Sequence, residues 1–221
     1  MVLQLPLPLH LHPEFFEIVE CINPLKDIDC ISPENYSNIS CYDPQYSLLQ
    51  YLKENNEVIS KRFEQFSGSR KIFPCTALAI DQMIFKYNIE CEGKTVVILG
   101  KSYLVGTPIN SLFFSKGATV HICNAKTKNK RKLISKADIL VTCTGKRLRL
   151  LPEYLKKGVI LFDVGIAFDS KTGEIKGDVN INQIKEKVGL FTPVPGGLGP
   201  LTVSNMIQNL YLSFLKQQFN K

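Results

Sequence analysis

The chain has 221 residues and a mass of 24.9 kDa, with 44% apolar and 21% charged residues. These values are typical of a globular protein and exclude disordered, collagen-like and disulfide-scaffold proteins. The 27 basic and 20 acidic side chains give a net charge of +7, which suits an anionic ligand such as a phosphorylated cofactor, a nucleic acid or a membrane surface.

The first 90 residues have an irregular pattern. Residues 1–12 are apolar but interrupted by Pro6 and Pro8, and no basic stretch precedes them, so the sequence does not predict a secretory signal. No apolar run reaches the roughly 18 residues that a membrane span needs. Residues 38–70 are polar, and we expect a loop there that carries one helix. Helical patterns are found at residues 13–22, 45–66 and 76–87.

From residue 94 onward, short apolar runs alternate with longer amphipathic ones. The short runs are mostly rich in β-branched residues and apolar on both faces, as are the strands of a parallel sheet joined by helical crossovers. Strands are expected at residues 95–99, 118–123, 138–144, 159–164 and 188–192, and helices at 108–114 and 201–215. The sequence therefore predicts an α/β protein with a Rossmann-type parallel sheet, which binds ligands at the carboxyl edge of its strands.

The turn after the first of these strands reads Gly100-Lys-Ser-Tyr-Leu-Val-Gly106-Thr-Pro108. Gly100 permits a tight turn, and backbone amides at the start of the following helix can face an anion. The spacing is not Gly-x-Gly-x-x-Gly, so by itself it indicates a dinucleotide only weakly, and a plain strand-to-helix turn is equally compatible with it.

The residues after the second strand read Asn124-Ala-Lys126-Thr127, where a dinucleotide's ribose is recognised in such folds. An acidic residue would favour NAD, whereas cations favour the 2′-phosphate of NADP. The segment from Lys126 to Lys132 holds five cations and no acid, so charge favours NADP. A solvated start of a helix is the alternative interpretation of this run. We do not expect nucleic-acid binding, because no aromatic side chains are interleaved with the charges.

A loop between residues 192 and 202 contains three prolines and three glycines, in the order Thr192-Pro-Val-Pro-Gly-Gly-Leu-Gly-Pro-Leu-Thr202. One interpretation is a rigid connector. The other is a stiff wall against which a flat ligand lies, with Thr202 at the start of the final helix as a further contact.

The seven cysteines are scattered and form no Cys-x-x-Cys pair, and the chain has three histidines, so no metal site is predicted. Free thiols at these positions indicate a reducing, cytoplasmic compartment. The cysteines are Cys21, Cys30, Cys41, Cys75, Cys91, Cys123 and Cys143.

Several motifs occur in one order along the chain. They are Val2-Leu-Gln-Leu-Pro-Leu-Pro8, Pro24-Leu-Lys-Asp-Ile-Asp29, Pro74-Cys-Thr76, Ile98-Leu-Gly-Lys-Ser-Tyr-Leu-Val-Gly-Thr-Pro108, Asp163-Val-Gly-Ile166, Gly177-Asp-Val179 and Pro193-Val-Pro-Gly-Gly197. Together they resemble the bifunctional methylenetetrahydrofolate dehydrogenase/methenyltetrahydrofolate cyclohydrolase family, from residue 2 to about residue 215.

The resemblance implies oxidation of 5,10-methylenetetrahydrofolate to the 5,10-methenyl form with NADP, or with NAD, and hydrolysis to 10-formyltetrahydrofolate. It also implies a homodimer. By the same resemblance, residues 1–90 are the remnant of a folate-binding catalytic domain in which 38–70 is an insertion. Residues 91–197 form the NAD(P)-binding domain, and residues 198–221 form a helix that returns to the catalytic domain.

The resemblance also assigns site residues. Gln4 matches the glutamine beside the catalytic lysine, and Asp29 matches the aspartate that hydrogen-bonds the pterin. The remaining folate-site residues are Pro195, Gly196 and Gly197. The cofactor-binding residues are Gly100, Lys101, Ser102, Val105, Gly106, Pro108, Lys126, Thr144, Gly145, Ile166 and Thr202.

The sequence departs from the family at its main catalytic motif, Tyr-x-x-x-Lys, which precedes the Gln-Leu-Pro-Leu segment. The lysine assists proton transfer in both steps. None of the eight tyrosines in this sequence has a lysine four positions later. Lys101 also replaces an arginine, which removes a bidentate phosphate donor, and Asn124-Ala125 replaces His-Ser, which removes a serine. Two hypotheses remain open: a bifunctional enzyme of which this chain is the greater part, and a catalytically silent NAD(P)- and folate-binding pseudoenzyme or partner subunit.

Overall fold

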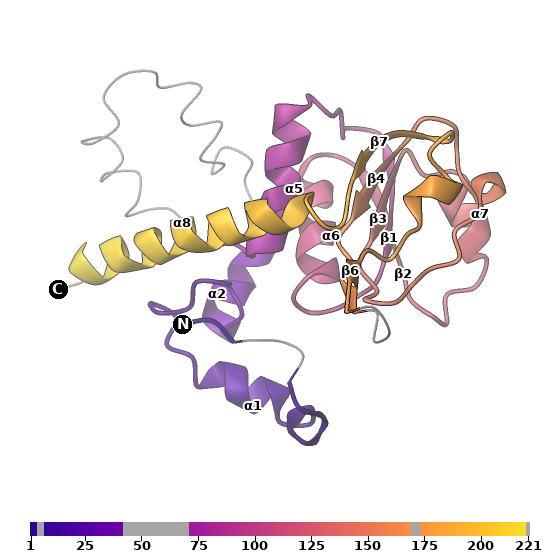
Figure 1. Ribbon diagram of the computed structural model, residues 1–221. Helices are drawn as coiled ribbons and strands as arrows, with labels where there is room; N and C mark the ends of the chain where they lie inside the picture. Colours follow the sequence, from indigo (N-terminus) through magenta and orange to yellow (C-terminus); the bar gives the residue numbers. More distant parts are fainter. Residues whose placement is uncertain (4–6, 42–70, 169–172, 220–221) are drawn as a thin grey trace.

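The computed structural model describes residues 1–3, 7–41, 71–168 and 173–219. Its centre is a five-stranded sheet in which all neighbouring strands run parallel (Figure 1). The strands are β1 (Thr95–Leu99), β2 (Thr119–Cys123), β3 (Ile139–Thr142), β4 (Val159–Asp163) and β7 (Val188–Thr192). Each lies within one of the five expected segments, so the predicted α/β class and parallel sheet are confirmed.

The spatial order of the strands is β2-β1-β3-β4-β7. The chain moves outward from β1 to β2 and then crosses back over β1 to β3. The chain leaves β1 toward β2 and leaves β3 in the opposite direction, toward β4. These two connections diverge and leave a crevice at the carboxyl ends of β1 and β3, where such sheets bind ligands.

Alternate residues of the three central strands, β1, β3 and β4, enter two separate cores, one on each face of the sheet. Ile98, Val141 and Phe162 pack into a core with helices α5 (Cys75–Lys86) and α6 (Gly106–Ser115). Leu99, Leu140 and Leu161 pack into the other, with helix α7 (Lys130–Ile134). Strands that are apolar on both faces are buried on both, as their sequences predict.

The helices agree with the sequence pattern less closely than the strands do. Helix α6 begins two residues before the expected start, and α1 (Phe15–Glu20) is shorter than the expected 13–22. Helix α2 (Pro33–Ser37) was not predicted; Ser32 caps it by accepting a bond from the Asn35 amide, and Pro33 occupies its first position. The helix expected at 45–66 lies outside the described residues.

The remaining described elements are short. They are the antiparallel pair β5 (Ala167–Phe168) and β6 (Ile175–Lys176), and the 3-10 turns η1 (Leu9–Leu11), η2 (Asn38–Cys41), η4 (Pro152–Tyr154) and η5 (Ile181–Gln183).

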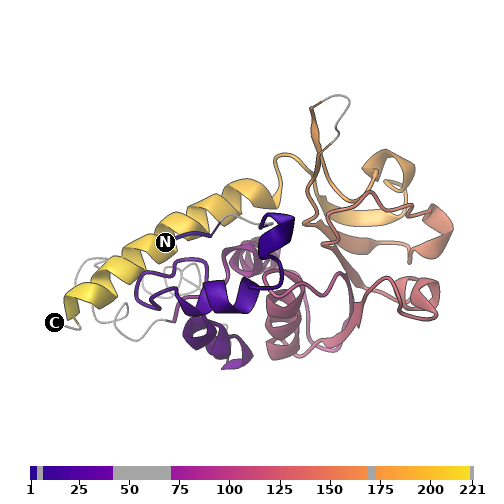
Figure 2. The same ribbon diagram turned by 90° about the horizontal axis from the view of Figure 1, so that it is seen from below.

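The last helix, α8 (Leu198–Phe219), packs along α5 and extends away from the sheet (Figures 1 and 2). Its buried side carries Asn205, Asn209 and Ser213 together with Leu198, Leu212 and Leu215, and its polar side chains bind the N-terminal segment. The Asn209 amide donates to the carbonyls of Ile28 and Phe73, both at 2.9 Å, and the Ser213 hydroxyl donates to the carbonyl of Leu25. The N-terminal segment, which precedes the sheet in the sequence, is thus hydrogen-bonded to α8, which follows it. No helix among the described residues is both long and apolar enough to span a membrane.

Replacing Leu112 by alanine is expected to lower the free energy of unfolding by about 2–5 kcal/mol, because this fully buried side chain on α6 would leave a cavity. Phe114→Ala on the same helix is the control: that ring is 74% exposed, and its loss is expected to cost less than about 0.5 kcal/mol. Urea unfolding of both variants measures the difference, and equal losses would contradict the described packing of α6.

Candidate functional site

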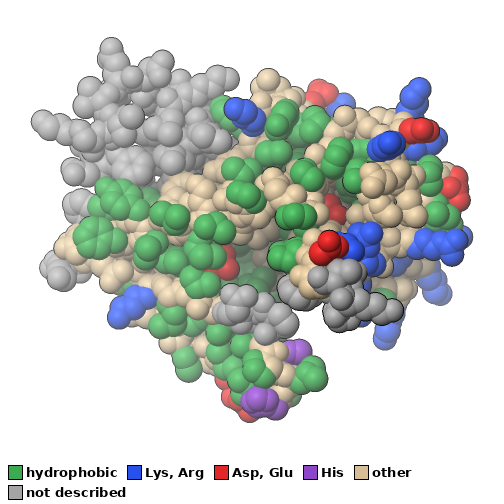
Figure 3. Space-filling view, viewed as in Figure 1, with side chains coloured by type: hydrophobic (Ala, Val, Ile, Leu, Met, Phe, Trp, Pro, Cys, Tyr) green, Lys and Arg blue, Asp and Glu red, His purple; other side chains and the backbone are tan. Residues whose placement is uncertain are grey.

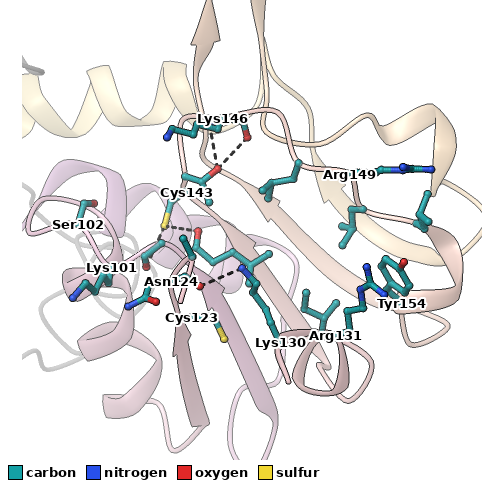
Figure 4. A pocket seen from close by; sticks show the side chains of 18 residues that line it. Lys101, Ser102, Cys123, Asn124, Lys130, Arg131, Cys143, Lys146, Arg149 and Tyr154 are labelled. Carbon is teal, nitrogen blue, oxygen red and sulfur yellow. Dashed lines mark hydrogen bonds between the residues drawn. The ribbon is translucent and has the colours of Figure 1, made fainter. Parts of the chain in front are cut away.

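A cavity of about 710 Å³ lies at the carboxyl ends of β1, β2 and β3 (Figure 4). Leu99 and Gly100 end β1, Cys123 and Asn124 end β2, and Cys143 follows β3. The opposite wall is the segment after β3, as far as Tyr154. The cavity therefore opens where the strand order predicts a ligand site.

Five cations and no acidic residue line this cavity. Lys101 follows β1, Lys130 and Arg131 belong to α7, and Lys146 and Arg149 come from the segment after β3. Figure 4 shows Lys130 and Arg131 on one side and Lys146 on the other. Cations that converge without a matching carboxylate create a positive potential, which attracts a polyanion.

Gly100 has a backbone conformation that other residues rarely adopt, with φ of +132°. A Cβ atom built on it would lie 2.5 Å from the carbonyl oxygen of Cys143 and 2.7 Å from its sulfur. A Cβ on Gly106 would lie 2.4 Å from the Gly100 carbonyl oxygen. The two glycines therefore let the β1 turn, the end of β3 and the first turn of α6 approach one another closely.

Ser102 closes this turn. Its hydroxyl oxygen accepts hydrogen bonds from the amides of Val105 and Gly106, both at 3.3 Å, and its carbonyl accepts from the amide of Thr107. The amides expected to face an anion are thus held partly by the Ser102 side chain. Pro108 is buried in the first turn of α6 and does not line the cavity.

The β2 end is a tight turn that places Lys130. The side-chain oxygen of Asn124 accepts from the amide of Lys126. The backbone carbonyl of Asn124 accepts from the Lys130 ammonium at 3.2 Å. Lys126 is exposed and is not among the lining residues of the cavity. The Arg131 guanidinium lies 4.7 Å from the centre of the Tyr154 ring, a cation–π contact that fixes its direction (Figure 4).

The wall after β3 is held by Asp178. One of its carboxylate oxygens accepts from the Thr144 amide at 2.6 Å and from the Thr144 hydroxyl at 2.8 Å. Arg147 donates to the carbonyls of Gly177 and Val179 on either side of Asp178. These bonds fix Thr144 at the mouth of the cavity.

Asp178 is in turn held by Asp163, the last residue of β4. The Asp163 carboxylate accepts from the Thr142 hydroxyl and from the amides of Asp178 and Val179, at 2.9–3.1 Å. Burial raises the pKa of Asp163, and the hydrogen bonds oppose that shift.

A second, more apolar cavity of about 560 Å³ lies on the other side of the β1 turn, and Ser102 lines both. Phe15 and Phe16 from α1 line it together with Tyr103 and Val105. The Tyr103 ring is stacked on Tyr36 at 3.6 Å, and the Tyr36 hydroxyl donates to the Tyr103 carbonyl. These aromatic contacts fix the β1 turn to the N-terminal segment.

The described residues among those predicted for the folate site do not line either cavity. Asp29 accepts from the Cys75 amide at 3.4 Å, at the start of α5, and burial raises its pKa. Gln4 lies outside the described residues. Pro195, Gly196 and Gly197 precede α8 and are not among the residues that line either cavity.

Three further residues predicted for the cofactor, Gly145, Ile166 and Thr202, do not line the large cavity. A Cβ on Gly145 would lie 3.8 Å from the carbonyl oxygen of Ile166, so the loops after β3 and β4 are neighbours, and Ile166 is 64% exposed. The Thr202 hydroxyl donates to the Leu198 carbonyl within α8. Of the residues predicted for the cofactor, the structure gathers Gly100, Lys101, Ser102 and Thr144 in the cavity wall.

Sequence reasoning missed Lys146 and Arg149 as lining residues. They follow β3 in a stretch without periodicity, and only the general rule that ligands bind beyond the carboxyl ends of parallel strands could have pointed to them. Among the described residues, no group of histidine, cysteine and acidic side chains is arranged to hold a metal ion.

Residues 74–218 match the family model described as the tetrahydrofolate dehydrogenase/cyclohydrolase NAD(P)-binding domain. The chain is similar to the bifunctional protein FolD of Streptococcus thermophilus, with 34% identity over 98% of this chain and 66% of the relative. It is also similar to FolD of Clostridium botulinum, with 37% identity over 95% of this chain and 64% of the relative. The chain thus spans somewhat less than two thirds of the length of these curated relatives.

Solved structures give the same result. The Campylobacter jejuni FolD methylenetetrahydrofolate dehydrogenase/cyclohydrolase superposes with a TM-score of 0.76 at 30% identity, over 97% of this chain and 66% of that one. The Trypanosoma brucei FolD, solved with NADP and an inhibitor, has a TM-score of 0.76 at 28% identity, over 99% of this chain and 67% of that one.

Replacing Asp178 by alanine is expected to release Thr144 and to lower the free energy of unfolding by about 1–3 kcal/mol, because buried donors would lose their acceptor. Hydrogen exchange measured by mass spectrometry should become faster in the peptide that contains Thr144. Asp178→Asn retains one oxygen that can accept both bonds, so we expect a smaller effect from it. Unchanged exchange in the alanine variant would show that Asp178 does not position this wall.

Proposed function

The chain belongs to the tetrahydrofolate dehydrogenase/cyclohydrolase family, and from that premise we propose that it binds NADP and a tetrahydrofolate derivative. The reaction would be oxidation of 5,10-methylenetetrahydrofolate to 5,10-methenyltetrahydrofolate, followed by hydrolysis to 10-formyltetrahydrofolate. When bound, NADP supplies the hydride acceptor. The observation that carries the proposal is the cation-lined cavity at the carboxyl ends of β1, β2 and β3.

The positive charge of the cavity and the close approach at Gly100 support binding of a phosphorylated dinucleotide. Gly100 leaves a cradle next to Cys143 that a side chain would fill. Lys101 and Ser102, which line the cavity, would contact the pyrophosphate, and Thr144 would contact it from the facing wall. An NAD-selective site would place an acidic residue at the end of β2, and the residues there are Asn124 and Ala125.

We assign recognition of the 2′-phosphate to Lys130 and Arg131. The Lys130 ammonium lies 3.2 Å from the carbonyl oxygen of Asn124, and so at the end of β2, where the ribose is recognised. The Tyr154 ring orients the Arg131 guanidinium beside it. Two cations at this position would compensate for the family's serine and arginine, which this chain replaces with Ala125 and Lys101.

The folate side of the site would be formed by the N-terminal segment and the loop before α8. Asp29 would hydrogen-bond the pterin, Gln4 would take the place of the glutamine beside the family's catalytic lysine, and the loop from Pro195 to Gly197 would form the wall. Burial favours a protonated Asp29 at a higher pH than for an exposed carboxyl, and a protonated carboxyl can donate a hydrogen bond to a ring nitrogen.

The alternative is a catalytically silent NAD(P)- and folate-binding protein or partner subunit. It is favoured by the lack of a Tyr-x-x-x-Lys motif within these 221 residues. The two hypotheses agree on binding and differ on turnover.

We expect Lys130→Ala and Arg131→Ala each to raise the Kd for NADP by about 10- to 100-fold, the effect of losing one charged hydrogen bond. The Kd for NAD should change by less than about threefold, because NAD lacks the 2′-phosphate. Calorimetric titration with both dinucleotides measures the ratio.

Lys126→Ala is the matched control, since Lys126 is a cation of the same turn that does not line the cavity. If Lys126→Ala weakens NADP binding more than Lys130→Ala, the sequence-based assignment of Lys126 holds and ours is wrong. Tighter binding of NAD than of NADP by the unaltered chain would overturn the cofactor assignment.

The 221-residue chain is expected to bind NADP but to produce no NADPH from 5,10-methylenetetrahydrofolate, because it contains no lysine of the Tyr-x-x-x-Lys motif to assist proton transfer. Absorbance of NADPH, with the Campylobacter jejuni enzyme as positive control, measures the rate. A measurable rate, or measurable hydrolysis of the methenyl compound, would exclude the silent alternative.

A further inference from the structure

The helix that carries the two cations assigned to the 2′-phosphate is weak by itself. Helix α7 has five residues, Lys130–Ile134, and isolated helices of this length are unstable in water. Its first three residues are cations, which repel one another and oppose the helix dipole. Its N-cap residue, Asn129, has φ of +55° and makes no side-chain capping bond. Contacts with the rest of the protein must therefore hold α7 in place.

The two ends of α7 are held differently. Leu133 and Ile134 pack into the core that α7 shares with the sheet, so apolar contacts anchor the end of the helix. The three cations at its start form no ion pair with a carboxylate among the described residues. Figure 3 shows that Lys and Arg side chains gather mainly over the half of the molecule that holds the sheet and α7. The contact between the Arg131 guanidinium and the Tyr154 ring, at 4.7 Å, joins this unpaired start to the facing wall of the cavity.

Tyr154 is the fixed partner in this contact. It ends the turn η4, which is closed by a hydrogen bond from the Tyr154 amide to the Leu151 carbonyl at 3.0 Å. Leu150 and Leu155 on either side of the turn are buried in the core that anchors the end of α7, and Tyr154 packs against the same core. Arg131, in contrast, is exposed. The ring therefore positions the cation, and not the reverse.

The Arg131–Tyr154 contact connects two walls of the cavity. Arg131 belongs to the segment after β2 and Tyr154 to the segment after β3, and β1 separates these strands in the sheet. Figure 4 shows the two side chains next to each other, at the end of the cavity away from Lys101 and Ser102. The contact is made without any group of a ligand. A site whose groups are already held in place binds more tightly, because less freedom is lost on binding.

We propose that the Arg131–Tyr154 contact preforms the 2′-phosphate site, so that Tyr154 is a positioning residue that acts on NADP through Arg131. This inference rests on the proposed function, which assigns Arg131 to the 2′-phosphate. Without the ring, the start of α7 opens in a larger fraction of the molecules, and the apparent Kd rises as the competent fraction falls. A cation–π contact at an exposed position changes such an equilibrium by about two- to fivefold.

The first test needs no cofactor. Hydrogen exchange, measured by mass spectrometry in the peptide that contains residues 129–136, should become about two- to fivefold faster in Tyr154→Leu. Tyr154→Phe retains the ring and should exchange like the unaltered chain. Tyr87→Leu is the matched control, the same substitution at an exposed tyrosine directly after α5, and should leave this peptide unchanged. Equal exchange in Tyr154→Leu and Tyr154→Phe would overturn the proposal.

The second test is calorimetric titration with NADP and NAD. Tyr154→Leu should raise the Kd for NADP by about two- to fivefold and the Kd for NAD by less than about twofold, because NAD lacks the 2′-phosphate. Tyr154→Phe should restore the NADP affinity. In a chain that already carries Arg131→Ala, Tyr154→Leu should add no further loss, since its effect passes through Arg131. Additive losses, or equal losses for both dinucleotides, would mean that Tyr154 contacts the ligand itself, and would contradict the proposal.

A third measurement covers the case in which Tyr154→Leu does not fold. A proton above an aromatic ring is shifted upfield, so the Nε–H signal of Arg131 in the unaltered chain should lie upfield of the signals of exposed arginines. Arg131→Lys, at an exposed position, identifies the signal by removing it. An unshifted signal would show that the contact does not exist in solution.

The same experiments separate this inference from the proposed function. An unchanged Kd for NADP in Arg131→Ala, with the exchange difference intact, would count against the assignment of Arg131 to the 2′-phosphate. Weaker NADP binding in Arg131→Ala, with no effect of Tyr154→Leu on exchange or on the Kd, would count against this inference alone.

Discussion

Asp163 is a buried carboxylate at which three strand ends and one loop meet. It ends β4, accepts from the Thr142 hydroxyl of β3, and binds the Thr192 hydroxyl of β7 through its own amide. It also accepts from the amide of Asp178. A buried carboxylate that lacked these donors would destabilise the fold by several kcal/mol, so the strands must end together and the loop must return to them. Asp178 then fixes Thr144, and the large cavity follows from this chain of contacts.

The cavity is lined by segments that follow the strands, and the sheet positions them. Five cations come from three separate segments, and the buried carboxylates Asp163 and Asp178 accept hydrogen bonds from backbone amides and hydroxyls. The positive potential is thus left free for a ligand. In this way one set of acidic side chains stabilises the fold without neutralising the site.

Ring contacts and hydrogen bonds join the N-terminal segment to the β1 turn and to α8, and several apolar side chains of α8 remain exposed. Tyr36 and Tyr103 fix the β1 turn to the N-terminal segment, and Asn209 fixes that segment to α8. The buried polar side chains of α8 pair with carbonyls of the N-terminal segment only in one position of the helix along that segment, because each carbonyl left unpaired would cost free energy.

The sequence by itself determined the five strands and the family, because β-branched apolar runs and ordered motifs are local properties of the chain. It also indicated Gly100, Lys101, Ser102 and Thr144, which follow strands directly. It did not give Lys146 or Arg149, nor the choice of Lys130 over Lys126 in the cavity wall, because the distance between loops depends on the order β2-β1-β3-β4-β7. That order, and the direction in which each side of α8 faces, are set by packing between residues far apart in the chain, which no local pattern encodes.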